Sequence, residues 1–374
     1  MKIVRRAFLS LALACLAIGC TTQNPINSES VAIYSASESA SESLRFLNTQ
    51  NQSNDESPKF TEGYVMAGGS RLHYVSGGSG KLVVFYHGFP SYWYIWKHQL
   101  RALANDYRVI AFDGLGTNLS DKPTEVSAFT VSNLSAQLRE AIEKLNGQEP
   151  YILVGHDWGG ALAWAYAQTN PPGLEKLVVL SAPPYNLFLE LLRSDADQRK
   201  ASQYVEYLKS AEGETRLKEN NALSFWKAGG YEKFVARGLI SPAEGELFKL
   251  AMARPDAVTG GVNWYRANLP LPHSITADDF WPSQSARTSV NSMLIWGETD
   301  KTFVPAFLQQ LPDYAEQLQI EILPGIGHTP QLEAPEKVNR LIRDFLRLSK
   351  IPRIVQSKHQ RASSRLPVID GRLS

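Results

Sequence analysis

Cysteine is nearly absent from this chain of 374 residues. Its two cysteines, Cys15 and Cys20, both lie within the first 20 residues. Residues 21–374 therefore hold no pair of thiols that could form an intramolecular disulfide, and the folded part of the chain must be stabilised by packing. The composition is that of an ordinary globular protein, with 43% hydrophobic and 10% aromatic residues available for a core.

Net charge and long apolar runs are also scarce. The formal net charge is +1, so the chain lacks the positive field typical of nucleic-acid binding, and we expect no nucleic-acid partner. The apolar run Ala7–Ile18 has 12 residues, whereas a helix that spans a bilayer needs about 20. Because Lys2, Arg5 and Arg6 precede this run, residues 1–20 are predicted to be a secretory leader.

The end of this leader, Ala17-Ile18-Gly19-Cys20, resembles the cleavage box of bacterial lipoproteins, although Ala17 stands where leucine is usual. The resemblance implies that Cys20 becomes lipidated and that this lipid anchors the protein to the membrane. We then expect an exported protein held at the bacterial cell envelope, in the outer membrane or the periplasm. The alternative is plain secretory cleavage near Gly19, which would give a secreted protein.

Composition divides the rest of the chain. Residues 21–60 are rich in Ser, Asn, Gln, Thr and Glu, and such a segment buries too little apolar surface to offset its ordering entropy, so a flexible tether is predicted. Residues 350–374 are basic and show no core pattern, and we predict a flexible tail there. Between them, strand and helix patterns alternate over residues 61–184 and 284–349, whereas residues 185–283 show helical patterns alone.

This alternation predicts the fold. Apolar runs such as Leu82–Tyr86 and Leu177–Leu180 are typical of strands buried on both faces of a parallel sheet, and Gly68-Gly69 indicates a hairpin. Val131–Leu145 has apolar residues at helical spacing. We therefore predict an α/β fold, a mostly parallel doubly wound sheet, with residues 185–283 inserted as a helical cap.

The most informative stretch is Tyr151–Gly160. Four apolar residues form a predicted strand, and Gly155 and Gly159 lie two residues on either side of Asp157. This spacing is typical of a nucleophile elbow, because so sharp a turn has no room for side chains beside its strained central residue. Asp157 is therefore predicted to be a carboxylate nucleophile that forms an ester with a substrate carbon. The alternative is that Asp157 only caps the helix that begins at Trp158.

An acid and a histidine follow in the order that a hydrolase triad of this kind requires. Asp300 follows the predicted strand Ser292–Trp296, and His328 follows the predicted strand Gln319–Leu323. Both side chains are therefore expected at the carboxyl edge of the sheet, where reacting groups gather. We predict that Asp300 orients His328, with Glu298 as the alternative acid.

The segment His87-Gly88-Phe89-Pro90 follows another buried strand. We predict that the backbone N–H groups of Phe89 and Trp158 converge as an oxyanion hole. The peptide bond before Pro90 is predicted to be cis, since a tight bend suits one. His87 is predicted to contact the substrate.

Several motifs together resemble one family. From about Glu62 to Leu348 the chain is similar to α/β-hydrolases of the Asp-nucleophile branch, which holds soluble-type epoxide hydrolases and haloalkane dehalogenases. The matching motifs are His87-Gly-Phe-Pro90, Asp113 with Ser120-Asp-Lys-Pro123, Gly155-His-Asp-Trp-Gly-Gly160, Trp296-Gly-Glu-Thr-Asp300 and Gly327-His328. The resemblance implies the α/β-hydrolase fold, no cofactor and no metal. One motif departs: the family has an Arg-Gly-aromatic run where this chain has Leu115-Gly116-Thr117-Asn118, which leaves the role of this loop open.

The cap distinguishes the two chemistries of this branch. A departing halide needs N–H donors, whereas the oxygen of an opening epoxide needs a proton from an O–H group. Two cap segments resemble those that carry the proton-donating tyrosines of epoxide hydrolases, namely Asn263-Trp-Tyr-Arg266 and Ser202-Gln-Tyr-Val-Glu-Tyr207. The resemblance assigns these roles to Tyr265 and Tyr204, with Tyr207 as the alternative to Tyr204.

The predicted function is hydrolysis of a small hydrophobic epoxide by water to a vicinal diol, in which Asp157 forms an ester and His328 activates the water that hydrolyses it. Haloalkane dehalogenation by the same triad is the alternative. Trp158 occurs in both groups of enzymes, and Trp264, which is predicted to contact the substrate, could serve as a second halide donor. A non-catalytic binding lipoprotein on a hydrolase fold is a third possibility, supported by the altered Leu115–Asn118 loop. The sequence does not predict an oligomeric state.

Overall fold

The computed structural model describes residues 42–49, 58–348 and 355–356. The predicted leader, its lipidation site Cys20 and most of the predicted tether and tail lie outside these residues and stay predictions. Within the described part of the chain, no helix is both long enough and apolar enough to cross a membrane.

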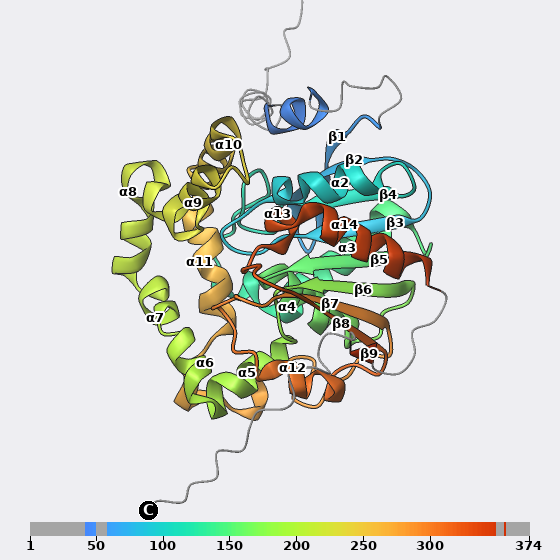
Figure 1. Cartoon of the computed structure of the whole chain (residues 1–374). Helices are drawn as coiled ribbons and strands as arrows, with labels where there is room; N and C mark the ends of the chain where they lie inside the picture. The colour runs from blue at the N-terminus through green and yellow to red at the C-terminus, as the bar shows by residue number, and fades with distance from the viewer. Residues whose placement is uncertain (1–41, 50–57, 349–354, 357–374) are drawn as a thin grey trace, which may run out of the picture.

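One sheet lies at the centre of the molecule (Figure 1). Its strands among the described residues are β1 (Thr61–Ala67), β2 (Ser70–Gly77), β3 (Leu82–Tyr86), β4 (Arg108–Phe112), β5 (Tyr151–His156), β6 (Leu174–Leu180), β7 (Asn291–Gly297), β8 (Leu318–Leu323) and β9 (Val355–Gln356). They pair in the order β1-β2-β4-β3-β5-β6-β7-β8-β9. β2 is antiparallel to both of its neighbours, and all other pairs are parallel. The prediction of a mostly parallel sheet is confirmed.

The strands form where the sequence provides apolar residues for both faces. Every residue of β3 and β5 is buried, as expected of central strands in a parallel sheet. Gly68 and Gly69 join β1 to β2 with φ angles of 55° and 74°. A two-residue turn with positive φ at both positions matches the twist of a hairpin, and glycine adopts it at little cost.

Helices cover both faces of the sheet (Figure 1). The helical segments of this core are η1 (Trp93–Trp96), α2 (Lys97–Leu103), η2 (Val126–Phe129), α3 (Val131–Asn146), α4 (Trp158–Ala167), α12 (Phe307–Gln310), η5 (Leu311–Asp313), α13 (Pro330–Glu333) and α14 (Pro335–Arg347). The chain steps from β3 to β4 in one direction and from β4 through β5 to β6 in the other. Right-handed crossovers therefore place α2 on one face and α3 and α4 on the opposite face. α13 and α14 pack against α2.

The topology of the sheet decides where a site can form. The strand order changes direction between β3 and β5, which are neighbours in the sheet. Because the helices that follow these strands lie on opposite faces, a crevice opens at their carboxyl ends. His87–Pro90 leave β3 and Asp157 leaves β5 at this place, so the predicted oxyanion-hole loop and the predicted nucleophile are adjacent.

Between β6 and β7 the chain leaves the sheet and forms a helical cap (Figure 1). Its segments are α5 (Tyr185–Ser194), α6 (Ala196–Ala201), α7 (Tyr204–Lys209), α8 (Ala211–Ala228), α9 (Tyr231–Ala236), α10 (Pro242–Met252), α11 (Ala257–Asn268), η3 (Pro272–Ser274) and η4 (Ala277–Asp279). Helix α8 is interrupted by non-helical backbone at Glu219–Ala222. Helix α11 packs against α7 and α8 in the cap and against η2 in the core, so it joins the two parts.

A buried ion pair also joins cap and core. The ammonium of Lys97 on α2 contacts the carboxylate of Glu244 on α10, and the two residues are only 2% and 5% exposed. The Tyr94 hydroxyl donates to Glu244 Oε1 at 3.0 Å. Glu244 Oε2 accepts from the backbone N–H of Ser241 at 2.8 Å, which closes a capping box at the start of α10. Glu244 therefore caps the start of α10 and also attaches this cap helix to the core.

Lys97→Met should lower the free energy of unfolding by about 3–5 kcal/mol, because it leaves the Glu244 carboxylate buried without its cation. The matched control is Lys144→Met, which removes an exposed pair with Glu140 whose side chains are 50% and 43% accessible and should therefore cost much less stability. Urea unfolding of both variants measures the difference. Equal losses would mean that the buried pair does not attach the cap.

Two segments differ from the sequence-based expectation. Residues 42–49, which we expected to lie in a flexible tether, form a helix in which Leu47 is fully buried. Ser43 Oγ lies 2.9 Å from the Tyr92 hydroxyl, and Asn48 exchanges two hydrogen bonds with the backbone of Phe60. The tether prediction is wrong for these eight residues, because the polar average of the segment hid apolar residues at helical spacing. The tail prediction is likewise wrong for β9, which pairs with β8.

Candidate active site

The nucleophile elbow has the crowded geometry that its glycines predict. Asp157 stands between β5 and α4 with φ 53° and ψ −123°, a backbone conformation that residues with side chains rarely adopt. A Cβ atom on Gly155 would overlap the carbonyl oxygen of Gly159, and one on Gly159 would overlap the backbone of Tyr86. Both positions therefore require glycine, and the surrounding structure holds Asp157 in its strained conformation.

The carboxylate of Asp157 points into the crevice and not along α4. It is 7% exposed and makes no capping hydrogen bond to α4, a helix that lies wholly within the described residues. Oδ1 accepts from the backbone N–H of Phe89 at 2.8 Å, and Oδ2 lies 3.3 Å from His328 Nε2. The interpretation of Asp157 as only a helix cap is therefore wrong.

Asp300 and His328 come from the loops after β7 and β8. Nδ1 of His328 lies 2.8 Å from Asp300 Oδ2, and Asp300 Oδ1 accepts from the backbone N–H of Thr302 at 2.8 Å. Glu298, the alternative acid, is exposed and accepts from the backbone N–H of Gly325 at 3.0 Å. The structure thus brings Asp300, and not Glu298, to the imidazole, which bridges two carboxylates.

Electrostatics favour a charged pair of Asp157 and His328. Burial alone lowers the pKa of His328, but the Asp300 and Asp157 carboxylates outweigh it and raise this pKa to about 10. Burial alone raises the pKa of Asp157, but its hydrogen bond to His328 and the charge of that ring bring the pKa below its usual range. At neutral pH the Asp157 carboxylate is therefore an anion that faces an imidazolium.

The stability of the protein should reflect this proton. Because His328 binds its proton more tightly in the folded state, the stabilisation is complete below the unfolded pKa of 6.5 and is lost as the pH rises through the folded pKa of about 10. Relative to His328→Gln, the wild-type free energy of unfolding should fall across this window. Urea unfolding of both proteins at the two ends of the window measures the change, and a constant difference would contradict it.

His156 supports His328, although the sequence analysis assigned His156 no role. Its Nε2 donates to the backbone carbonyl of His328 at 2.8 Å. Burial lowers the pKa of His156 to about 4, and the neighbouring imidazolium of His328 lowers it in the same direction, so His156 stays neutral. The available signal was its place beside Asp157 at the carboxyl end of β5, because the loops after β7 and β8 reach the same edge of the sheet.

The oxyanion hole has one donor in place. Phe89 already donates its N–H to Asp157 Oδ1, and the Phe89–Pro90 peptide is cis, as predicted. The N–H of Trp158 belongs to the first turn of α4, where backbone donors have no acceptor within the helix. The Phe89 N–H therefore lies beside the carboxylate, and the part of Trp158 in an oxyanion hole stays a prediction.

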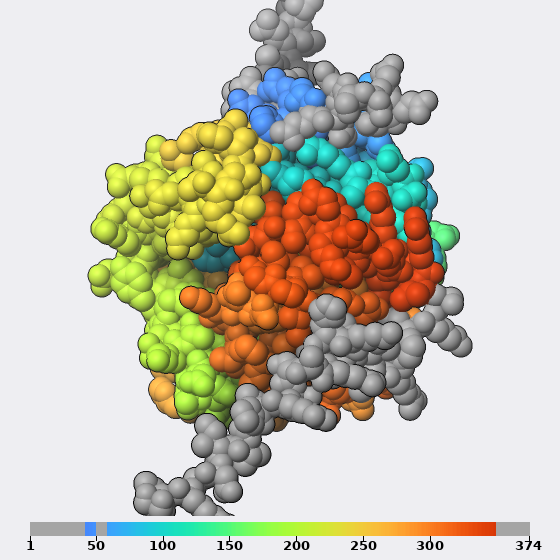
Figure 2. All heavy atoms as spheres, viewed as in Figure 1, coloured from blue at the N-terminus to red at the C-terminus, as the bar shows by residue number. Residues whose placement is uncertain are grey.

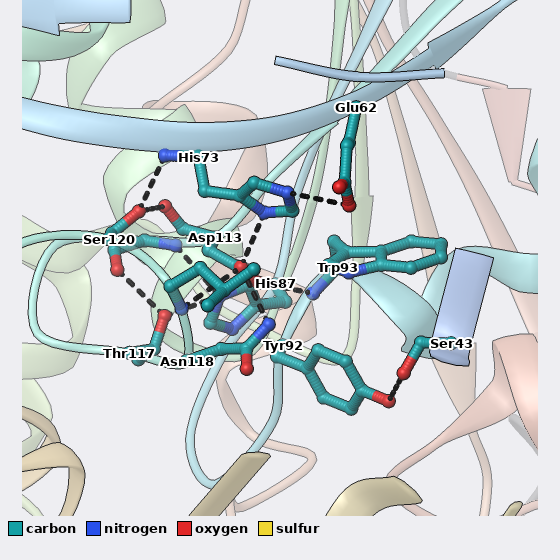
Figure 3. Close-up of polar contacts among 12 residues, drawn as sticks. Ser43, Glu62, His73, His87, Tyr92, Trp93, Asp113, Thr117, Asn118 and Ser120 are labelled. Atoms are coloured by element: carbon teal, nitrogen blue, oxygen red, sulfur yellow. Dashed lines mark hydrogen bonds and ion pairs between the residues drawn. The ribbon is translucent and has the colours of Figure 1, made fainter. Parts of the chain in front are cut away.

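His87 holds the loop after β3 (Figure 3). Its Nδ1 donates to the backbone carbonyl of Gly88 at 2.8 Å, and its Nε2 accepts from the backbone N–H of Gly114 at 2.9 Å. Burial lowers the pKa of His87, so the ring is neutral and both nitrogens are engaged. Because the backbone uses its donor and its acceptor, and because its ring lines an apolar pocket, the predicted substrate contact of His87 is limited to packing.

A cavity of about 390 Å³ connects the reactive groups and is lined by Asp157, His328, Tyr204 and Tyr265 among others. Figure 2 shows the molecule hollowed between the yellow-green cap and the orange-red part of the core. An adjoining pocket that also reaches Asp157 is bounded by apolar side chains, including Ala161, Pro183, Phe188, Val205, Leu269 and Phe303. Such a site suits a small apolar ligand. Among the described residues, no group of three or more His, Cys, Asp or Glu side chains could hold a metal ion.

The cap brings two tyrosines to this cavity. Tyr265 on α11 is 4% exposed, and its ring centroid lies 5.2 Å from that of Trp158 and 6.5 Å from that of Tyr204. Burial raises the pKa of both tyrosines, and the Asp157 carboxylate raises both further, so the phenols keep their protons. Tyr204 and its alternative Tyr207 are almost equally exposed, at 49% and 51%, but only Tyr204 lines the cavity.

The indole N–H of Trp264 is engaged by the protein backbone. Trp264 is 4% exposed, and its indole N–H donates to the carbonyl oxygen of Leu115 at 2.9 Å. A halide could use this donor only if that bond were broken. Trp264 borders a second apolar pocket with its carbon atoms, so its predicted substrate contact is limited to packing, and its predicted part as a halide donor is not supported.

Comparisons with known proteins agree with this geometry. A family model described as the alpha/beta hydrolase fold matches residues 81–335. "Epoxide hydrolase 3" of Mus musculus is 30% identical over an alignment of 289 residues, and the match covers 75% of this chain and 75% of that protein. "AB hydrolase superfamily protein YfhM" of Bacillus subtilis is 32% identical over 76% of this chain and 97% of its own length.

Solved structures give the same result. An inhibitor complex of a Bacillus megaterium epoxide hydrolase is similar with a TM-score of 0.71 and 28% identity, and the match covers 76% of this chain and 100% of that one. Fold, site geometry and relatives agree. This chain is a hydrolase that belongs to the α/β-hydrolase family, among its members of the epoxide-hydrolase type.

Proposed function

We propose that this enzyme hydrolyses epoxides to vicinal diols through a covalent ester on Asp157. The observation that carries the proposal is that the Asp157 carboxylate, the His328 imidazole and the phenols of Tyr204 and Tyr265 line one cavity. A carboxylate can attack carbon, an imidazole can activate water, and phenols can donate protons to an opening ring.

In the first step, Asp157 Oδ2 attacks an epoxide carbon and the carbon–oxygen bond of the ring breaks. The hydroxyl groups of Tyr204 and Tyr265 donate a hydrogen bond and a proton to the departing oxygen. Oδ1, which already accepts from the Phe89 N–H, becomes the carbonyl oxygen of the ester. The raised pKa of each tyrosine favours the protonated form that this step needs.

Ester formation removes the negative charge of Asp157, which is one of the causes of the high pKa of His328. The pKa of the imidazole therefore falls, and its proton replaces the one that the tyrosines gave up. This fall in the pKa of His328 is needed, because only a neutral imidazole can act as the base of the second step.

In the second step, neutral His328 takes a proton from water, and the oxygen of that water attacks the carbonyl carbon of the ester. The N–H groups of Phe89 and Trp158 stabilise the oxyanion, a contribution of roughly 10²-fold in rate per donor. The tetrahedral intermediate collapses, its hydroxyl proton passes to the leaving alkoxide, and the diol is released. Asp157 is again a carboxylate and His328 an imidazolium.

Two assays test the class of reaction. Purified enzyme is given styrene oxide, with diol formation as readout, and 1-bromobutane, with halide release as readout. We expect diol and no halide, because the indole N–H of Trp264 already donates to the carbonyl oxygen of Leu115 and so cannot bind a departing halide. Halide alone would establish the dehalogenase, and neither product would favour a binding protein.

A single turnover in heavy-oxygen water tests the ester. The label should enter Asp157 and be absent from the diol, because the product takes the original carboxylate oxygen. Label that appears in the diol during this first turnover would exclude the ester and require direct attack of water on the epoxide.

A further inference from the structure

The loop Gly114–Asn118 lies between the oxyanion-hole loop and the cap, and it is where the sequence departs from the family pattern. On its core side, Gly114 donates its N–H to His87 Nε2 at 2.9 Å. The Asn118 side-chain amide donates to Asp113 Oδ2 at 2.8 Å (Figure 3). Asp113 is fully buried and also binds His73 Nδ1 at 2.7 Å, so this end of the loop is fixed in the core.

The other side of the loop holds α11 and the turn before it. The carbonyl oxygen of Leu115 accepts from the Trp264 indole at 2.9 Å. Gly116 lies against Gly260 on α11, and a Cβ atom on Gly260 would overlap the carbonyl oxygen of Gly116. The two backbones therefore touch directly, and this close contact fixes the position of α11 relative to the loop.

Asn118 connects the two sides through a single side chain. Its Oδ1 accepts from Arg254 Nε in the cap at 2.9 Å, while its Nδ2 donates to Asp113 in the core. The amide orientation is unambiguous, because a guanidinium can only donate and a carboxylate can only accept. Asn118 is 5% exposed with φ 39°, a conformation that asparagine tolerates better than most residues.

Tyr265 follows Trp264 directly on α11, so whatever holds this helix also sets the position of the Tyr265 hydroxyl over Asp157. We propose that Asn118 is a positioning residue for epoxide opening, which joins Asp113 in the core to Arg254 in the cap and so keeps Tyr265 in place. This inference rests on the proposed function.

The two chemical steps depend on different parts of the protein. Ring opening needs the cap, because Tyr204 and Tyr265 act there. Ester hydrolysis uses groups of the core, namely His328, Asp300 and the N–H groups beside Asp157. Loss of the Asn118 bridge should therefore slow ester formation and leave ester hydrolysis near the wild-type rate.

The experiment uses Asn118→Ala, Arg254→Met and the double variant with styrene oxide, and acid quench with mass spectrometry follows the ester through a single turnover. Each single variant should form the ester about tenfold to a hundredfold more slowly, since a displacement near 1 Å can cost that much. The double variant should be no slower than the slower single variant, because both changes break the same bridge. Arg254→Lys, which keeps a donor and the charge, should recover part of the rate.

The control is Arg216→Met, since Arg216 is an exposed cap arginine on α8 that pairs with Glu219; its ester formation should equal the wild-type rate. If the wild type forms ester but Asn118→Ala and Arg254→Met form it within twofold of the wild-type rate, this proposal is overturned. It is also overturned if formation and hydrolysis slow by the same factor, as a general loss of structure would cause. If the wild type forms no ester at all, the proposed function fails first and the inference fails with it.

Discussion

Asp157→Ala should lower the turnover of styrene oxide by roughly four orders of magnitude or more, as loss of a covalent nucleophile does elsewhere. Alanine has no oxygen that can bond to the substrate carbon. The remaining groups of the cavity can bind an epoxide and polarise it, but their reaction would then depend on direct attack by water. The measurement is diol formation at saturating substrate, where the loss should lie in kcat.

A second variant separates this loss from misfolding. Asp157 has φ 53°, and glycine adopts this conformation without strain. Asp157→Gly should therefore be as inactive as Asp157→Ala but more stable than Asp157→Ala in urea unfolding, because both variants lose the carboxylate and only glycine also relieves the backbone strain. Diol formation by Asp157→Gly within tenfold of the wild-type rate would refute the role of this carboxylate as the nucleophile.

His328→Gln should stop turnover after one event per molecule. Asp157 can still attack, but no base activates the water, so the ester accumulates and kcat falls by about 10²–10⁴-fold. The protein mass should increase by the mass of one styrene oxide molecule, and the modified peptide should contain Asp157. Asp300→Asn should act in the same direction, since Asp300 Oδ2 lies 2.8 Å from His328 Nδ1.

Tyr265→Phe gives the contrasting result that makes this test specific. It should slow ring opening, so turnover falls without accumulation of the ester. If His328→Gln loses activity without a trapped ester while its fold is intact, His328 does not act in the second step. If Tyr265→Phe accumulates ester, the tyrosine has been assigned to the wrong step.

The sequence predicted the parts of the site that local motifs encode. Asp157 was identified from the glycines around it, and Asp300 and His328 from their places after predicted strands. Parallel strands bring their carboxyl ends to one edge, so residues that follow different strands meet there whatever their separation along the chain. The distances of 2.8 Å and 3.3 Å around His328 follow from this topology.

Tertiary contacts decided which competing side chains are available. His87 and Trp264 were expected to touch the substrate, yet the backbones of Gly114 and Leu115 occupy their nitrogen atoms. Tyr204 and Tyr207 are equivalent by motif, and only the packing of α7 shows that Tyr204 lines the cavity. The helix over residues 42–49 was missed for a related reason, because its apolar residues depend on a distant surface to bury them.

The sequence by itself thus determined the fold and placed Asp157, Asp300 and His328 together, because each depends on a short pattern and on the rule that gathers strand ends. The tertiary structure alone decided how the cap is held over them. The contacts Arg254–Asn118 and Trp264–Leu115 join residues 136 and 149 positions apart. No local pattern specifies such pairs, since they form only when the cap packs against the core.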